Sequence, residues 1–148
     1  MAQTMTPEEF LAQSTIDPAV AELRPDYRVL LMVAEGLDPE SGAEVADCLV
    51  AQAEAHARVL LAESPAEELP HIASWRDAYR AFGAKPQRTR NSLEALTRRA
   101  PGGLPRINPL ADIYNAISVL YQLPLGGEDF AMSQGPARVI RSAGDEPF

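Results

Sequence analysis

The chain has 148 residues and a net charge of −8, with 46% hydrophobic and 23% charged residues. These values are typical of one globular domain, here residues 1–148, that buries a core of its own. No run approaches the roughly 18–20 apolar residues of a membrane span, and the first ten residues lack a basic and then apolar signal, so we predict no membrane partner. The single cysteine, Cys48, excludes an internal disulfide and suits a reducing cytoplasm; we expect it to be a small buried hydrophobic residue.

The charges are distributed unevenly along the chain. Residues 1–70 have a net charge of −11, whereas residues 71–110 have a net charge of +6 and eight basic side chains, seven of them arginine. Two interpretations stay open. The arginines could contact phosphate groups, or the basic segment could pair with the acidic one inside the fold.

The first half of the chain predicts two helices and a strand. Residues 6–9 (TPEE) have the pattern of a capped helix start with proline in the first turn. Residues 27–33 (YRVLLMV) form a short apolar run that predicts a largely buried strand. Ser41 and Glu44 have the spacing of a capping box, and the alanine-rich residues that follow predict a helix to about Glu63. Its apolar stripe is partial, so we expect a broad solvated face.

Two further helices are predicted in the basic segment. Residues 71–82 place four large apolar side chains on one helical face, namely Ile72, Trp75, Tyr79 and Phe82. We expect Arg76 and Arg80, beside that face, to reach solvent. The second helix is predicted at residues 92–99.

The last third begins with a strong helix start, because Asn108 suits the N-cap and Pro109 the first turn. Residues 109–121 then predict a helix whose buried stripe consists of Leu110, Ile113, Ile117 and Leu120. A tight loop follows at residues 123–127, and residues 137–142 (ARVIRS) predict a strand. The fold class is therefore α+β.

Residues 102–146 carry three short motifs in order. The first, L-P-x-I-N-P-x-x-D-x-x-N, ends at Asn115; the second, L-P-x-G-G-x-D, ends at Asp129; the third, R-x-A-x-D-E, begins at Arg141. This order resembles the B3/B4 domain, a tRNA-binding and editing module of the β subunit of phenylalanyl-tRNA synthetase that also occurs as free-standing proteins. The resemblance is best over residues 70–148 and implies helices packed on a mixed β-sheet.

The resemblance also implies a site. In the family, the helix of the first motif backs the pocket that receives the aminoacyl end of a mischarged tRNA. The corresponding substrate-binding residues here are Asn108, Asp112, Tyr114, Asn115, Gly126 and Gly127. The candidate contacts to tRNA phosphates are Arg88, Arg90, Arg98 and Arg99.

These residues also have purely structural interpretations. On a helix, Asn108, Asp112 and Asn115 would project along one edge, away from the apolar stripe. Asn108 would serve as an N-cap in any case, and Asp112 is favoured near the positive end of the helix dipole. The paired glycines permit positive φ angles and close approach of a ligand to the backbone, or form an ordinary turn.

Two positions depart from the bacterial synthetase β subunits that the motifs resemble. Gly126 stands where those subunits carry a histidine that contributes to editing, and Tyr114 stands where they carry a threonine. Free-standing family members also continue for several tens of residues beyond the third motif and include there the acidic residue implicated in editing. We therefore expect a module that is incomplete at its C-terminal end and assign no catalytic residue. An incomplete sheet would expose a strand edge for a partner or a second copy to cover.

Other chemistries find little support. His56 and His71 are fifteen residues apart without carboxylates or cysteines at ligand spacing, so we predict no metal site and no cofactor. No serine lies in a nucleophile motif. Two functions remain. The chain is either a free-standing protein that binds aminoacyl-tRNA and hydrolyses mischarged forms, or a non-catalytic module of the same fold that binds tRNA, protein or a small molecule.

Overall fold

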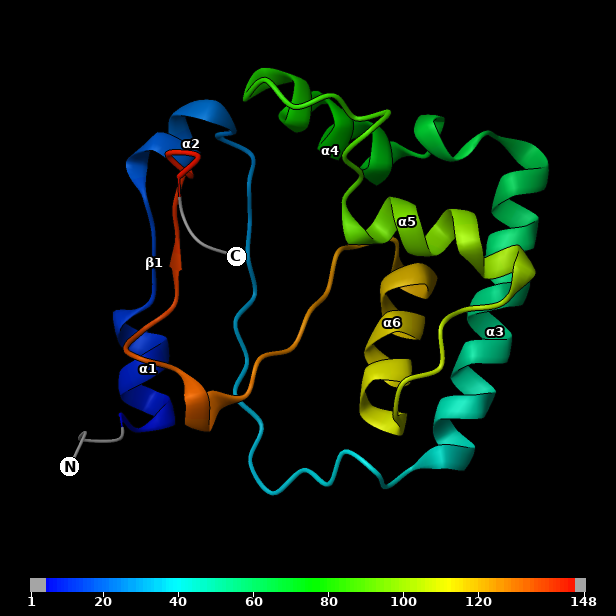
Figure 1. The fold of residues 1–148 in the computed structure, drawn as a ribbon, viewed down its shortest axis with the longest axis horizontal. Coiled ribbons are helices and arrows are strands. Elements are labelled where there is room, and N and C mark those ends of the chain that lie inside the picture. Colours follow the sequence, from blue (N-terminus) through cyan, green and yellow to red (C-terminus); the bar gives the residue numbers. More distant parts are fainter. Residues whose placement is uncertain (1–4, 146–148) are drawn as a thin grey trace. The chain divides into compact units, whose positions relative to one another are not determined.

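The computed structural model describes residues 5–145, and their contacts divide the chain into two compact units. In the described range, unit 1 comprises residues 5–36 and 128–145, and unit 2 comprises residues 37–127. The described residues are rich in helix and contain a two-stranded sheet, so the α+β class is confirmed at this coarse level (Figure 1). None of the helices in this part of the chain is long and apolar enough to span a bilayer.

Unit 1 is built around a short parallel pair of strands. Its elements are α1 (Pro7–Gln13), β1 (Thr15–Ile16), α2 (Pro18–Leu23), a 3-10 turn (Phe130–Met132) and β2 (Arg138–Val139). In the sheet, Thr15 lies opposite Arg138, and the backbone N–H of Thr15 donates to the carbonyl of Ala137 at 3.0 Å. The rings of Phe10 and Phe130 meet edge to face with centroids 5.3 Å apart. The strand predicted at residues 137–142 is thus confirmed only for Arg138–Val139.

The prediction of a buried strand at residues 27–33 is wrong. Residues 28–33 belong to no helix or strand, and two of the largest side chains are exposed, Leu30 at 89% and Met32 at 81%. An apolar run forms a strand only where a neighbouring strand accepts its hydrogen bonds, and no strand among residues 5–145 pairs with it.

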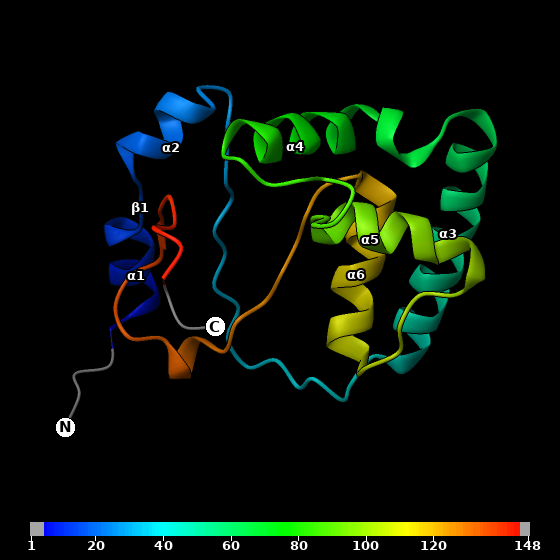
Figure 2. The ribbon, with the colours of Figure 1, turned by 45° about the horizontal axis from the view of Figure 1, so that its top comes forward.

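Unit 2 is helical. It contains α3 (Ala43–Glu63), a 3-10 turn (Ala66–Glu68), α4 (Pro70–Ala81), α5 (Ser92–Arg99), a second 3-10 turn (Ala100–Gly102) and α6 (Pro109–Tyr121). The bounds predicted for α3, α5 and α6 are confirmed, and those of α4 are shifted by one residue. Figure 1 and Figure 2 both show α3 and α6 lying side by side, and these helices form the most extensive contact of the unit.

Small side chains line the contact between α3 and α6. The main core cluster contains Val50, Ala53, Ala57, Ala100, Leu104, Ala116 and Val119. The stripe predicted for α6 is therefore wrong in register. Leu110, Ile113, Ile117 and Leu120 are only half-buried, whereas Ala111, Ala116 and Val119 are buried. Alanines allow two helices to approach closely, and the larger side chains then lie at the flanks of the contact.

Two local predictions for α3 also need correction. Its N-cap is Gly42 at φ 82°, without a side-chain cap, so Ser41 and Glu44 form no capping box. Cys48 is exposed rather than buried, and the amide of Gln52 donates to its sulfur at 3.1 Å. The broad solvated face that we expected for α3 is confirmed, since only Ala46, Val50, Ala53 and Ala57 of this helix are buried.

The buried face of α4 differs from the predicted one. Ile72 is buried as expected, but Phe82 is exposed and Trp75 and Tyr79 are only half-buried. Arg76, which we expected to reach solvent, is instead buried. A partner for its charge explains this placement: Nη1 of Arg76 donates to Oε1 of Glu94 at 2.8 Å. Hydrophobic periodicity cannot anticipate a buried ion pair.

Candidate functional site

The N-terminal end of α6 uses two of the predicted site residues for its own structure. The side chain of Asn108 caps the helix by accepting the backbone N–H of Ala111 at 2.8 Å. Asp112 is buried and accepts the backbone N–H of Ile107 at 2.8 Å. Its other oxygen lies 3.4 Å from Nη1 of Arg106. Asp112 was expected along a helix edge away from the apolar stripe. Its burial is possible because these donors replace the water that a carboxylate needs.

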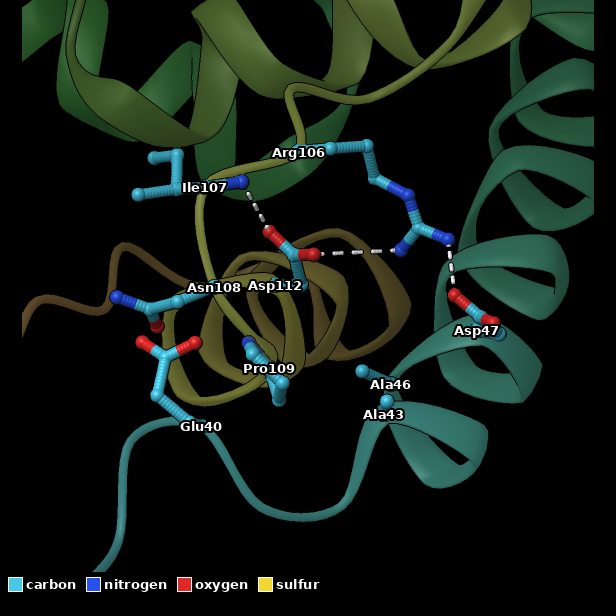
Figure 3. Close-up of a pocket in the computed structure, with 9 residues that line it drawn as sticks. All are labelled: Glu40, Ala43, Ala46, Asp47, Arg106, Ile107, Asn108, Pro109 and Asp112. Carbon is cyan, nitrogen blue, oxygen red and sulfur yellow. Dashed lines mark hydrogen bonds and ion pairs between the residues drawn. The ribbon is translucent and has the colours of Figure 1, made fainter.

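Arg106 joins α6 to α3. Its guanidinium contacts Asp112 with one nitrogen and Asp47 of α3 with another. Beside it lies a shallow depression of about 300 Å³, whose lining residues are drawn in Figure 3. Its lining consists of Glu40, Ala43, Ala46, Asp47, Arg106, Ile107, Asn108, Pro109 and Asp112. Sequence reasoning missed Asp47 and Arg106, because their pairing joins positions 59 residues apart.

Asn115 is the motif side chain that the fold leaves unused. It is half-buried on α6, and its amide makes no hydrogen bond to any other residue in the range 5–145. The preceding residue, Tyr114, is also half-buried, and its ring lies against the loop of residues 123–127, which we call the glycine loop. Cε1 of the ring is 3.5 Å from the position that a Cβ on Gly127 would take. The structure thus brings Tyr114 and Gly127 together.

The glycine loop is anchored where it leaves α6. Gln122 ends the helix in the left-handed region at φ 52°, and its carbonyl lies 2.6 Å from Nδ1 of His71 in α4. The hydroxyl of Ser118 donates to the carbonyl of Leu123 at 2.6 Å. Neither Gly126 nor Gly127 has a positive φ, so the backbone freedom that paired glycines permit is not used here. A side chain at Gly126 would meet no atom within 4 Å, so this part of the loop is open.

The four arginines predicted to contact phosphate are all exposed, but they differ in their partners. Arg98 pairs with Glu67 at 2.6 Å and with Glu94 at 3.0 Å, and Nε of Arg90 lies 3.7 Å from Glu94. Arg99 donates to the carbonyl of Gly103 at 3.3 Å. The guanidinium of Arg88 has no ion pair or hydrogen bond with any residue that the structure describes.

The basic and acidic segments do pair in part. Arg98 binds Glu67, and Arg106 binds Asp47, so two cations of the basic segment meet carboxylates from residues 1–70. The backbone N–H of Glu67 and the guanidinium of Arg98 lower the pKa of the Glu67 carboxyl. Each interpretation of the charge pattern therefore applies to different arginines. Arg98 and Arg106 serve the fold, and Arg88 stays available to an outside anion.

Metal-binding chemistry has no support from the described side chains. Within residues 5–145, no group of three or more histidine, cysteine, aspartate or glutamate side chains gathers as metal ligands do. The glutamate of the third motif, Glu146, lies outside the described residues.

A comparison with known families identifies the chain. The family model described as the B3/4 domain matches residues 74–148, just over half of the sequence. The chain therefore belongs to the B3/4 domain family. No curated protein and no solved structure matches it. The matched segment includes α5, α6, the glycine loop and β2.

Proposed function

We propose that this chain binds the acceptor end of an aminoacyl-tRNA and receives the aminoacylated 3′ end between Tyr114, Asn115 and the glycine loop. The observation that carries this proposal is the unused amide of Asn115, half-buried next to a tyrosine that packs on the loop. A half-buried polar side chain without a protein partner is free to bind a ligand. Membership of the B3/4 family, with its resemblance to a tRNA-editing module, supplies the class of ligand.

The proposed reaction is hydrolysis of the ester that joins a wrong amino acid to the terminal ribose. A water molecule attacks the ester carbonyl, the bond to the ribose oxygen breaks, and a proton passes to that oxygen as the amino acid leaves. The amide of Asn115 would orient the amino acid or the ribose. Backbone N–H groups at Gly126 and Gly127 would stabilise the negative charge that develops on the carbonyl oxygen.

The size of Tyr114 bears on selectivity in this proposal. A tyrosine occupies more volume than the threonine of the bacterial β subunits, and its ring already lies against Gly127. A smaller space favours smaller amino acids, because a pocket of fixed size rejects larger ones sterically. A Cβ on Gly126 would meet no atom within 4 Å, so a ligand could approach the glycine loop at this residue.

The proposed contact to the tRNA backbone is Arg88, supported by its exposure and its unpaired guanidinium within the described structure. Such a contact releases counterions from the RNA, so binding should weaken as salt increases. Arg90 and Arg99, which have weaker partners than Arg98, would add to this contact after small side-chain movements.

A second function has one observation in its favour. Neither an asparagine nor a glycine exchanges protons near neutral pH, and Gly126 stands where the bacterial subunits carry a histidine. The alternative is therefore a non-catalytic module of the same fold that binds tRNA, protein or a small molecule without chemistry.

The mixed β-sheet of the family belongs to the proposal as well. β1 and β2 would be two strands of it. Amide hydrogen exchange tests this idea. Slow exchange at Thr15 and Asp17, whose backbone N–H groups donate to the carbonyls of Ala137 and Val139, would support it, and fast exchange at both would exclude it.

A deacylation assay separates the two functions. The 148-residue chain is incubated with a panel of mischarged tRNAs, and release of amino acid is followed for the wild type, Asn115→Ala and the control Gln134→Ala, an exposed residue of unit 1. Turnover that Asn115→Ala abolishes and Gln134→Ala leaves unchanged supports editing. Binding without turnover selects the non-catalytic module as a tRNA binder, and absence of both removes the proposed function.

A further inference from the structure

The C-terminal end of α6 has an unusual backbone conformation. Gln122 ends this helix at φ 52°, and it is the one residue other than glycine with a positive φ among residues 5–145. A left-handed conformation is unfavourable for a residue with a Cβ atom, and it persists only where surrounding contacts hold it. Because the glycine loop starts at the next residue, these contacts also decide in which direction the loop leaves the helix.

Contacts to three helices hold Gln122 in this conformation. In α6, its side-chain Nε2 donates to the carbonyl of Val119 at 2.8 Å. In α5, the buried hydroxyl oxygen of Thr97 accepts a hydrogen bond from the same nitrogen at 3.3 Å. In α4, Nδ1 of His71 lies 2.6 Å from the carbonyl oxygen of Gln122. His71 thus connects the start of the glycine loop to a helix that lies 51 residues earlier in the chain.

The partner of His71 decides which of its ring nitrogens carries the proton. A carbonyl oxygen can only accept a hydrogen bond, so Nδ1 must be the protonated nitrogen. Nε2 has no hydrogen bond with any residue in the described range. The His71 side chain is exposed, and the buried residues of α4 are Ile72, Arg76 and Ala78. Loss of the imidazole should therefore leave α4 in its place.

The glycine loop depends on its two ends for its position. The backbone N–H groups of residues 125–127 donate no hydrogen bond to any residue in the range 5–145, and Pro124 has no N–H to donate. One end of the loop follows Gln122, and at the other end the ring of Tyr114 lies against Gly127. A change at Gln122 should therefore reorient the N–H groups of residues 125–127.

We propose that His71 is a positioning residue of the glycine loop. By donating from Nδ1 to the carbonyl of Gln122, it sets the direction of the loop and thereby the affinity for the aminoacylated end of the RNA. This inference rests on the proposed function, in which the N–H groups of Gly126 and Gly127 face the ligand. His71 acts through Gln122 and does not itself touch the ligand. It also lies before the matched segment, residues 74–148, so family membership assigns it no role.

NMR of the free, full-length chain tests the geometry. At about pH 8, where an ordinary histidine is neutral, ¹⁵N spectra should show the proton of His71 on Nδ1. Residual dipolar couplings of residues 125–127 report the orientation of each N–H bond. They should change in His71→Ala and return to the wild-type values in His71→Asn, because the asparagine amide supplies an N–H donor in place of Nδ1. Asp77→Ala, an exposed change in the same helix, is the control and should leave the couplings unchanged.

Ligand binding tests the consequence. The probe is an amide-linked, non-hydrolysable analogue of a 3′-aminoacylated terminal adenosine, and calorimetric titration measures its affinity. We expect His71→Ala to weaken binding about 3- to 10-fold, the effect of one hydrogen bond, and His71→Asn to restore it to within about 2-fold. Asp77→Ala should bind as the wild type does. The thermal midpoint of His71→Ala should stay close to that of the wild type, because the lost hydrogen bond is exposed.

The two measurements separate this proposal from the proposed function. A proton of His71 on Nε2, couplings or an affinity that His71→Ala leaves unchanged, or a His71→Asn variant as weak as His71→Ala would each overturn the positioning role. A wild type that does not bind the analogue would instead remove the proposed function. The couplings alone would then decide whether His71 positions the loop.

Discussion

Arg76 and Glu94 form a buried ion pair between α4 and α5, with Nη1 of the arginine 2.8 Å from Oε1 of the glutamate. The same carboxylate oxygen accepts Nε of Arg98 at 3.0 Å, and Arg90 approaches it to 3.7 Å. Glu94 is only 1% exposed, and its second oxygen has no hydrogen bond from residues 5–145. One carboxylate therefore organises three of the arginines in the basic segment.

Replacement of Glu94 should be costly. Glu94→Leu keeps a similar volume but leaves the guanidinium of Arg76 buried without its partner, so we expect the free energy of unfolding to fall by about 3–5 kcal/mol. Urea denaturation measures this change. Asp77→Ala, which breaks the exposed pair with Arg80, is the control and should cost less than about 1 kcal/mol. The double variant Arg76→Met with Glu94→Leu should be more stable than Glu94→Leu alone. Equal costs for Glu94→Leu and Asp77→Ala would contradict the burial of the pair.

The arginines should separate into an RNA-binding and a structural class. Arg88→Gln removes a free cation, so we expect tRNA affinity to fall several-fold, roughly 3- to 10-fold, and the slope of log K against log salt to shrink by about one. Thermal stability should not change. Arg98→Gln should lower thermal stability, because it breaks contacts with Glu67 and Glu94. The pair of variants is measured by fluorescence anisotropy at several salt concentrations. An unchanged slope in Arg88→Gln would exclude Arg88 as a phosphate contact.

The pKa of Glu67 reports on Arg98 directly. In the folded protein the pKa of this carboxyl lies below its ordinary value, first because its own backbone N–H donates to it and then because of the Arg98 side chain. A carboxyl with a lowered folded pKa stabilises the fold above its unfolded pKa and loses this contribution as the pH falls through the folded value. Arg98→Gln should raise the Glu67 pKa only part of the way, because the backbone donor remains. A ¹³C NMR titration of the carboxyl carbon checks this, and no rise would mean that Arg98 points elsewhere in solution.

Two asparagines of one motif should behave in opposite ways. Asn108→Ala removes the N-cap of α6 and should cost about 1 kcal/mol of stability, while the folded fraction keeps its full tRNA binding and any deacylation. Asn115→Ala should leave the free energy of unfolding within about 0.5 kcal/mol and reduce function. Denaturation and activity are measured on the same preparations. If the Asn108→Ala variant were as stable as the wild type but inactive, Asn108 would be a binding residue and not only the N-cap of α6.

Local signals in the sequence were sufficient for most helices of this chain. The start of α6 at Asn108 and Pro109 was readable because an N-cap depends on the neighbouring few residues alone. The buried faces were less predictable. α6 turns its alanines, rather than its leucines, toward α3, since the approach of a second helix decides which side chains are enclosed.

Distant pairing explains the remaining differences. The burial of Arg76 depends on Glu94, eighteen residues later, and the burial of Asp112 depends on Arg106 and the turn before α6. Residues 27–33 have the composition of a strand but no partner strand in the described structure. For the site, the motifs located Tyr114, Asn115 and Gly127 in the chain, but only the structure brings the tyrosine ring onto the loop.

The most direct test of the account is an NMR titration of the full chain with a non-hydrolysable analogue of a 3′-aminoacylated terminal adenosine, joined through an amide. The account predicts saturable shifts of the Asn115 side-chain amide and of the backbone N–H groups of Gly126 and Gly127, with smaller changes at the depression beside Arg106. Asn115→Ala should weaken binding, whereas Asn108→Ala should not. Shifts confined to the depression between Glu40 and Asp112, or none at all, would contradict a binding site at the glycine loop.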